Sequence, residues 1–199
     1  MSILSPEKQE YQLQNFVQET LDNFSMTRHL ADLIISYRKA KVPLPRATVH
    51  IEGNLPSAHI SAETCGFLVV PVIRMALLDC DRALAFFGLA CDRSPDGLKP
   101  IRLPRHHSDD LGIERFGLPL VTAAQFTQTA STVVSTKIEP MLMKVHEWRN
   151  KLIAHFTTSE PVVEYPEIRD VSIVMTEAYM HFLFDALGRP RPSINPSPM

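Results

Sequence analysis

The spacing of apolar side chains along the chain predicts helices rather than strands. Near the N-terminus, Leu13, Phe16, Val17 and Leu21 recur three or four positions apart, which is the period of one face of an α-helix. Only seven glycines occur, and long stretches are rich in Ala, Leu, Met, Glu and Gln, which favour helix. The pattern predicts helices over residues 6–24, 25–42, 61–91, 119–156 and 166–187.

Prolines and turn residues divide these segments. Pro71 is expected to kink the third helix or to mark its true start, and Pro140 to break the fourth near its middle. Residues 47–59 are rich in turn formers and could include a short strand. Residues 92–118 are expected to form a long irregular loop, and loops of that length tend to be functional or mobile.

Short connections between helices favour antiparallel neighbours, so the predicted fold class is all-α, a helical bundle. The chain shows no internal repeat, and 199 residues suffice for one domain with a substantial core. A single domain is therefore expected over residues 1–188. The Pro-rich segment 189–199 is expected to be disordered.

Composition and charge narrow the classes of function. The formal net charge is −2, whereas a broad, non-specific nucleic-acid binder usually carries a basic excess, so any nucleic-acid contact must be local. The three cysteines form no C-x-x-C pair, which suits a reducing compartment. Neither a signal peptide nor an apolar run of the roughly 18 residues that span a membrane is evident. A cytoplasmic protein without a membrane partner is expected.

The stretch EWRNKLIAH, residues 147–155, is the strongest candidate for chemistry. On a helix its residues continue a mostly apolar stripe that comprises Met141, Val145, Trp148, Leu152 and His155. Arg149 lies at the edge of that stripe. Arg149 and His155 are six residues apart, which on a straight helix separates them by about 120° and roughly 9 Å. They can converge only if the helix bends or ends there, or if a second copy of the chain contributes its own pair.

A purely structural interpretation accounts for the same stretch. Trp148 and the stripe around it are typical of a core anchor. A protonated His near a helix C-terminus is favoured by the helix dipole, and Arg149 beside Glu147 is typical of a solvated ion pair. On this interpretation the segment only packs, and the protein is a structural subunit.

The residue identities in this stretch also match a known sequence motif. RNKLIAH resembles the R-x4-6-H motif of the HEPN superfamily, with a polar residue directly after the Arg and Ala directly before the His. Upstream, RMALLDCDRALAFFGLACDRS is similar to the second helix of the abortive-infection-type branch, where an LLD-x-DRAL pattern precedes a loop. The resemblance spans residues 60–160 and continues more vaguely to 188, and it implies a HEPN-like helical bundle.

The resemblance also implies an activity. Members of the superfamily are commonly metal-independent endoribonucleases in defence or toxin–antitoxin systems, and they form the active site across a homodimer. It assigns Arg149 and His155 as the catalytic pair and Asn150 as a supporting polar residue, with no cofactor and no metal. The implied partners are RNA, a second copy of the chain, and an antitoxin or another component of a defence system.

Two points keep an alternative open. Many toxin members carry a Tyr two residues after the His, where a partner enzyme modifies it, whereas this chain has Thr157 there. Some members of the superfamily are inactive binding modules. The alternative function is therefore a catalytically silent helical module that binds a nucleotide, an RNA or a protein partner.

Two further clusters of polar residues occur in the sequence. The segment RLPRHHSDD could in principle ligate a metal, but no second ligand pair accompanies it, and a local phosphate-contacting patch or a plain solvated surface fits it better. The second cluster, Asp79, Asp81 and Arg82, is expected to bridge helices, and one of its members could approach the Arg149 motif.

Overall fold

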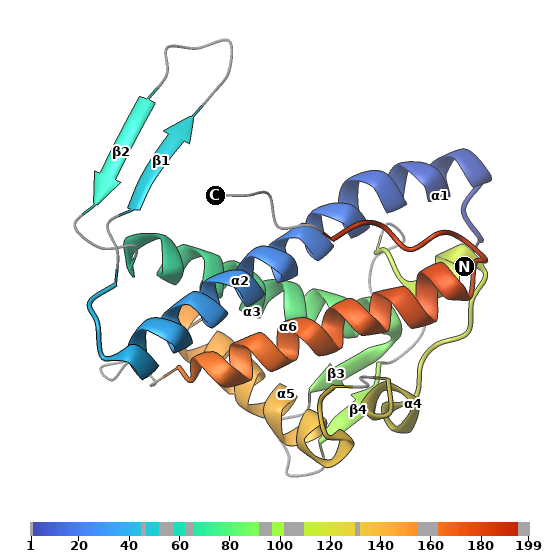
Figure 1. The fold of residues 1–199 in the computed structure, drawn as a ribbon. Coiled ribbons are helices and arrows are strands. Elements are labelled where there is room, and N and C mark those ends of the chain that lie inside the picture. The colour runs from blue at the N-terminus through green and yellow to red at the C-terminus, as the bar shows by residue number, and fades with distance from the viewer. Residues whose placement is uncertain are drawn as a thin grey trace.

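The structure is a computed structural model, and most of the chain is helical (Figure 1). The residues that it describes are 2–44, 47–51, 58–62, 66–91, 97–101, 110–129, 132–154 and 163–194. The predicted all-α class is confirmed at the level of predominantly helical structure. Two short two-stranded sheets accompany the helices in the described ranges.

The first helical run is longer than predicted. α1 (Pro6–Gln12), a π-helical turn η1 (Leu13–Val17) and α2 (Gln18–Ala40) follow one another without interruption. Ser5 caps the start by accepting a hydrogen bond from the Lys8 amide, and Lys41 ends the run in the left-handed conformation at φ 57°. The predicted boundary at Ser25 is therefore wrong. Neither proline nor glycine interrupts residues 7–40, and the apolar face continues past Ser25.

A hairpin separates this run from the next helix. β1 (Ala47–Ile51) and β2 (Ala58–Ala62) pair in antiparallel register, with Val49 opposite Ile60, and the hairpin projects from the bundle (Figure 1). The expectation of a short strand in residues 47–59 is thus met by two strands. α3 (Gly66–Phe87) follows and contains Pro71 in its second turn, where the exposed side allows the loss of one backbone donor.

The segment predicted as one irregular loop, 92–118, contains regular structure in its described part. β4 (Leu98–Pro100) pairs with β3 (Leu89–Cys91), and the 3₁₀ helix η2 spans Ile113–Phe116. β3 precedes the segment and occupies the end of the predicted helix 61–91, because α3 already ends at Phe87. Gly88 turns the chain from α3 into β3 at φ 90°, where a side chain would meet Leu120. The strands are only three residues long, so the sequence carried too little alternation to reveal them.

The predicted helix over 119–156 is two helices. α4 (Ala123–Thr127) begins with a capping box between Thr122 and Gln125, and α5 (Ser135–Arg149) continues as the π-helix η3 (Asn150–Ala154). The break therefore precedes residue 135 instead of falling at Pro140. Pro140 lies inside α5 on its exposed side, where water can satisfy the carbonyl that loses its intrahelical partner.

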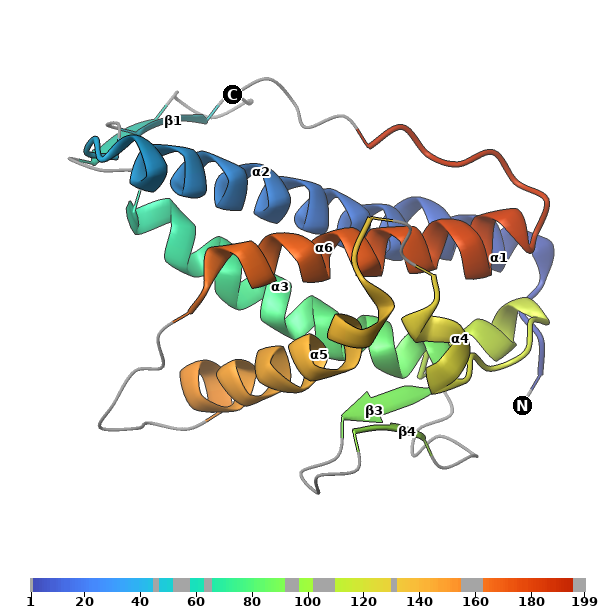
Figure 2. The same cartoon turned by 60° about the horizontal axis from the view of Figure 1, so that its bottom comes forward.

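The final helix matches its prediction closely. α6 (Tyr165–Tyr179) continues as η4 (Met180–Asp185), and Gly188 follows at φ 64°. The long helices α2, α3, α5 and α6 run in alternating directions, with α2 and α6 side by side along much of their length (Figure 2). Within the described ranges, no helix combines the length and the apolarity that crossing a membrane requires.

The core is aromatic toward the C-terminal end of α3. Phe87 contacts Tyr179 with ring centroids 4.9 Å apart, and Phe86 contacts both Phe87 and Tyr179. All three side chains are fully buried or nearly so. This cluster joins α3 to α6, and it fixes the turn of α3 that precedes it, which carries Asp79 and Asp81.

Some side chains of residues 189–194, the described part of the Pro-rich segment, contact the helices. Arg189 forms an ion pair with Glu10 at the start of the first helical run. Arg191 pairs with Asp185, and Ile194 packs against the core. The disorder expected for residues 189–199 stays a prediction, and residues 195–199 lie outside the described ranges.

Candidate functional site

The apolar stripe of α5 packs into the core and anchors the candidate stretch there. Met141, Val145 and Trp148 are buried, and Leu152 is partly buried against the core. Trp148 retains 3% of its accessible surface, so its predicted role as a core anchor is confirmed. Burial of this face leaves Arg149 at the edge, where 32% of its side chain remains exposed.

Asp81 on α3 reaches the predicted motif. Its Oδ2 lies 3.1 Å from Nε of Arg149, the distance of an ion pair, although the Nε–H does not point along a hydrogen-bond direction. Its other oxygen, Oδ1, lies 3.1 Å from Nδ1 of His146. The expectation that one member of the Asp79, Asp81 and Arg82 cluster approaches the motif is therefore confirmed, and the member is Asp81.

Two further contacts close the arrangement into a ring. Asn150 Nδ2 lies 3.0 Å from Nε2 of His146, and Arg149 Nη1 donates a hydrogen bond of 2.8 Å to Oδ1 of Asn150. These contacts form a closed loop of four side chains: Asp81 contacts His146, His146 contacts Asn150, Asn150 contacts Arg149, and Arg149 contacts Asp81. We call these four residues the polar ring. Two of them, Arg149 and Asn150, were predicted from the sequence, and the structure brings them together.

His146 is a member that the sequence analysis missed. It lies on the same helical run as Asn150, four residues earlier, where side chains on a helix are neighbours. That spacing was available from the sequence. The partner Asp81 was not, because the contact spans 65 positions and depends on how α3 packs on α5.

The polar ring is only partly buried. Asp81 retains 23% of its side-chain surface and His146 retains 19%. Side chains with this access can meet a ligand from solvent. The ring thus combines fixed geometry with an open side.

The neighbouring carboxylate, Asp79, has different surroundings. It is 3% exposed, accepts a hydrogen bond of 2.9 Å from Asn23 of α2, and lies 3.6 Å from Nη1 of Arg82. Burial raises the pKa of Asp79, while the Asn23 hydrogen bond and the Arg82 charge oppose that rise. Asp79 therefore joins α2 to α3 and does not face the polar ring.

The described cysteines are unsuited to nucleophilic chemistry. Burial raises the pKa of Cys80 well above its ordinary value, and it raises the pKa of Cys91 to about 12, helped by the charge of Asp81. Both side chains stay protonated thiols near neutral pH. Arg149 and the imidazole and amide groups beside it remain the candidates for chemistry in this region.

His155, the predicted partner of Arg149, lies outside the described residues. The helix that leads to it departs from α geometry immediately after Arg149, because η3 is π-helical from Asn150 to Ala154. π-Helical turns are rare and frequently mark functional sites. The convergence of Arg149 and His155 was expected to need either a bend or end of the helix there or a second copy of the chain, and η3 is a departure from straight α geometry just before His155.

Metal and phosphate sites were also examined among the described residues. In those ranges no group of three or more His, Cys, Asp or Glu side chains could hold a metal ion. Most of the RLPRHHSDD segment, including His106, His107 and Asp109, lies outside the described residues. The expectations for that segment, whether phosphate patch or solvated surface, stay untested.

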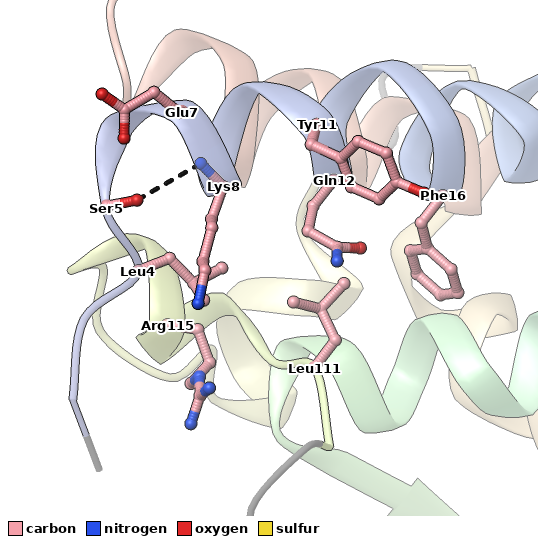
Figure 3. Close-up of a pocket in the computed structure, with 9 residues that line it drawn as sticks. All are labelled: Leu4, Ser5, Glu7, Lys8, Tyr11, Gln12, Phe16, Leu111 and Arg115. Atoms are coloured by element: carbon pink, nitrogen blue, oxygen red, sulfur yellow. Dashed lines mark hydrogen bonds between the residues drawn. The ribbon is translucent and has the colours of Figure 1, made fainter.

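A pocket lies between the start of the first helical run and the segment around η2 (Figure 3). Its volume is about 690 Å³, and apolar side chains such as Phe16, Tyr11 and Leu111 form much of its wall. Lys8 and Arg115 lie along one edge of it (Figure 3). The pocket shares no residue with the polar ring.

Comparisons of this chain with protein-family models, curated proteins and solved structures find no match. The resemblance to the HEPN motif therefore rests on the residues of the sequence.

Proposed function

We propose that this protein is a metal-independent endoribonuclease that cleaves RNA with Arg149 and His155, with Asn150 in a supporting role. The observation that carries the proposal is the fixed guanidinium of Arg149, which Asp81 and Asn150 hold six residues before His155. A nuclease that uses no metal needs a permanent positive charge at the phosphate, and this geometry supports that role for Arg149.

The chemistry follows from the side chains. His155 accepts the proton from a ribose 2′-hydroxyl, and an imidazole is suited to this because it changes protonation state at roughly neutral pH. The 2′-oxygen attacks the adjacent phosphorus, and the P–O bond to the 5′-oxygen breaks as that oxygen takes up a proton. The products are a 2′,3′-cyclic phosphate and a 5′-hydroxyl. Arg149 stabilises the charge that builds on the phosphate oxygens.

The setting of this activity is part of the proposal. A homodimer that places two copies of the motif together is the proposed active form, as the family resemblance implies. A cytoplasmic role in defence or growth arrest, restrained by an antitoxin or another partner, follows from the family resemblance. Asp81 supports the proposal because its contact explains how a partly exposed Arg stays in one orientation.

The test is cleavage of total RNA by the purified protein in excess EDTA. Wild type is compared with His155→Ala and Arg149→Ala, and the ends of the products are analysed for cyclic phosphate. We expect cleavage by wild type only. Matched controls are His181→Ala and Arg82→Ala, because both side chains are exposed and lie outside the polar ring. Both controls should cleave like wild type.

The outcomes separate the two candidate functions. Equal cleavage by all variants would reject the proposed site and indicate another nuclease or another site. No cleavage by a folded wild-type dimer would reject the enzyme and favour the inactive binding module. In that case the same variants are tested for RNA binding, which Arg149→Ala should weaken.

A further inference from the structure

His146 links the two halves of the polar ring, and its two nitrogens meet partners of different chemistry. Nδ1 lies 3.1 Å from a carboxylate oxygen of Asp81, and Nε2 lies 3.0 Å from Nδ2 of Asn150. An ionised carboxylate only accepts hydrogen bonds, so Nδ1 must carry the hydrogen. An amide nitrogen only donates, so Nε2 must be the accepting nitrogen. Both contacts are satisfied together only when His146 is neutral and protonated at Nδ1.

The orientation of the Asn150 side chain follows from the same contacts. Its amide group donates to His146, which turns its oxygen toward Arg149, and that oxygen accepts from Nη1 at 2.8 Å. If the amide were turned around, its oxygen would face the lone pair of His146 and its NH₂ group would face the guanidinium. Both contacts would then be repulsive. Arg149, which only donates, thus fixes the orientation of Asn150, and a neutral His146 protonated at Nδ1 is the state that fits this orientation.

Protonation of His146 conflicts with the ring. An added hydrogen on Nε2 would point at the NH₂ group of Asn150, so that two donors oppose each other. Rotation of the amide relieves this contact but places the NH₂ group against Arg149. One of the two contacts, from His146 to Asn150 or from Asn150 to Arg149, is therefore lost in either arrangement.

The charged and titratable groups near His146 come from three elements. Asp81 of α3 brings a negative charge to the ring, and Arg149 on the same helical run brings a positive charge. Cys91 of β3 is near enough for the Asp81 charge to affect its pKa, but it remains a neutral thiol. On α5 itself, Glu147 pairs with Lys151, and Lys144 pairs with Glu164 and Glu167. The polar ring carries no net charge when His146 is neutral and one positive charge when it is protonated.

We propose that His146 is a positioning residue, whose neutral form completes the contacts of Asn150 with His146 and with Arg149, so that protonation of His146 breaks one of these contacts and loosens the Arg149 guanidinium. This inference rests on the proposed function for the role of Arg149 at phosphate. Its structural part, the dependence of Arg149 order on His146, does not depend on RNA cleavage.

Two substitutions separate the contacts of His146. His146→Gln places an amide near the position of Nε2, where its oxygen can still accept from Asn150, but it cannot titrate. His146→Asn places an amide near the position of Nδ1, where it can donate to Asp81, and it loses the contact with Asn150. His181→Gln is the matched control. His181 also lies near a carboxylate, 3.9 Å from Asp185, but it is 61% exposed and lies outside the polar ring.

The first measurement uses ¹⁵N-labelled full-length protein. NMR correlation spectra identify which ring nitrogen of His146 carries the hydrogen, and the Arg149 Nε–H signal reports whether the guanidinium is held. We expect the Nδ1-protonated form at neutral pH. We also expect the Arg149 signal to weaken as His146 titrates, to be weak at every pH in His146→Asn, and to lose this pH dependence in His146→Gln and not in His181→Gln.

The second measurement is the pH profile of RNA cleavage. His146→Asn is expected to lower kcat/KM about tenfold, the effect of losing one ordinary hydrogen bond. His146→Gln is expected to lack one acidic limb of the wild-type profile while the limb due to His155 remains. A structural role alone would change the melting temperature and leave both the profile and the Arg149 signal unchanged.

Failure of each proposal has a different signature. An Nε2-protonated His146, or an Arg149 signal that is insensitive to all His146 variants, overturns the positioning role whether or not RNA is cleaved. A wild-type protein that shows the expected NMR behaviour but cleaves no RNA overturns the proposed function alone. Melting temperatures near that of wild type confirm that both His146 variants fold.

Discussion

Asp79 and Asp81 lie two residues apart on α3, yet their side chains contact different helices. Asp79 faces α2, where Asn23 donates to it and only 3% of its surface is exposed. Asp81 faces α5, where it meets His146 and Arg149 and keeps 23% of its side-chain surface. Residues two positions apart on an α-helix point in directions that differ by about 200°. Carboxylates with this spacing can therefore lie on opposite faces of the helix.

The comparison shows how a structural carboxylate differs from one at a candidate site. Asp79 bears the cost of burial, which raises its pKa, and it joins two helices through a neutral amide. Asp81 keeps solvent access and orients two side chains that themselves remain accessible. Removing the charge of Asp79 should therefore change stability, whereas removing that of Asp81 should change function. The following predictions test this contrast.

The largest effect is expected at the arginines that accompany the two carboxylates. Arg149→Ala should lower kcat/KM for RNA cleavage by about a thousandfold, roughly 4 kcal/mol of transition-state stabilisation. Arg82→Ala should leave the rate within twofold of wild type. Steady-state kinetics in EDTA measure both. Equal losses in the two variants would show that charge near α3, and not the polar ring, governs the rate.

The second-largest effect is expected for Asp81→Asn. An amide at this position offers one accepting oxygen where the carboxylate offers two, so it cannot hold both His146 and Arg149. We expect kcat/KM to fall by about a hundredfold, because the guanidinium loses its fixed orientation, with little change in melting temperature. Kinetics and thermal unfolding on the same preparation separate the two effects. A wild-type rate accompanied by a lower melting temperature would make Asp81 purely structural.

Asp79→Asn should leave cleavage unchanged and stabilise the fold by roughly 1 kcal/mol at pH 7. The folded protein raises the pKa of Asp79 above 3.8, so its native state binds this proton more tightly than the unfolded chain does. Wild-type stability at this residue is therefore greatest at low pH and falls as pH rises through the folded value. The advantage of the Asn variant should accordingly shrink toward pH 4. Urea unfolding at several pH values measures it.

The smallest effect is expected at Tyr179, which packs beside Asp79. Its hydroxyl is fully buried and has no hydrogen-bond partner among the described residues, and burial together with the nearby Asp79 charge raises its pKa. Tyr179→Phe removes an unsatisfied polar atom from the aromatic cluster, so stability should rise by about 0.5–1 kcal/mol. Thermal unfolding tests this. A clear loss of stability would reveal a partner for the hydroxyl.

Much of the helical content could be predicted from the sequence. The apolar period placed the last helix within a few residues of its observed start and end, and it placed Met141, Val145 and Trp148 on one buried stripe. Helix ends were predicted less well. The boundary at Ser25 was wrong because no residue there prevents the helix from continuing, and the break before residue 135 carries no proline or glycine that could have announced it.

The candidate site divides in the same way. Arg149 and Asn150 were predicted as site residues from the local sequence motif. His146 could have been predicted as well, because residues four positions apart on a helix are neighbours. The choice of Asp81 over Asp79 was made only by the fold. Which face of α3 turns toward α5 depends on the rotation of a packed helix, and the aromatic cluster around Phe86, Phe87 and Tyr179 fixes that rotation. Local periodicity determines which residues share a face, whereas packing across the bundle determines what that face meets.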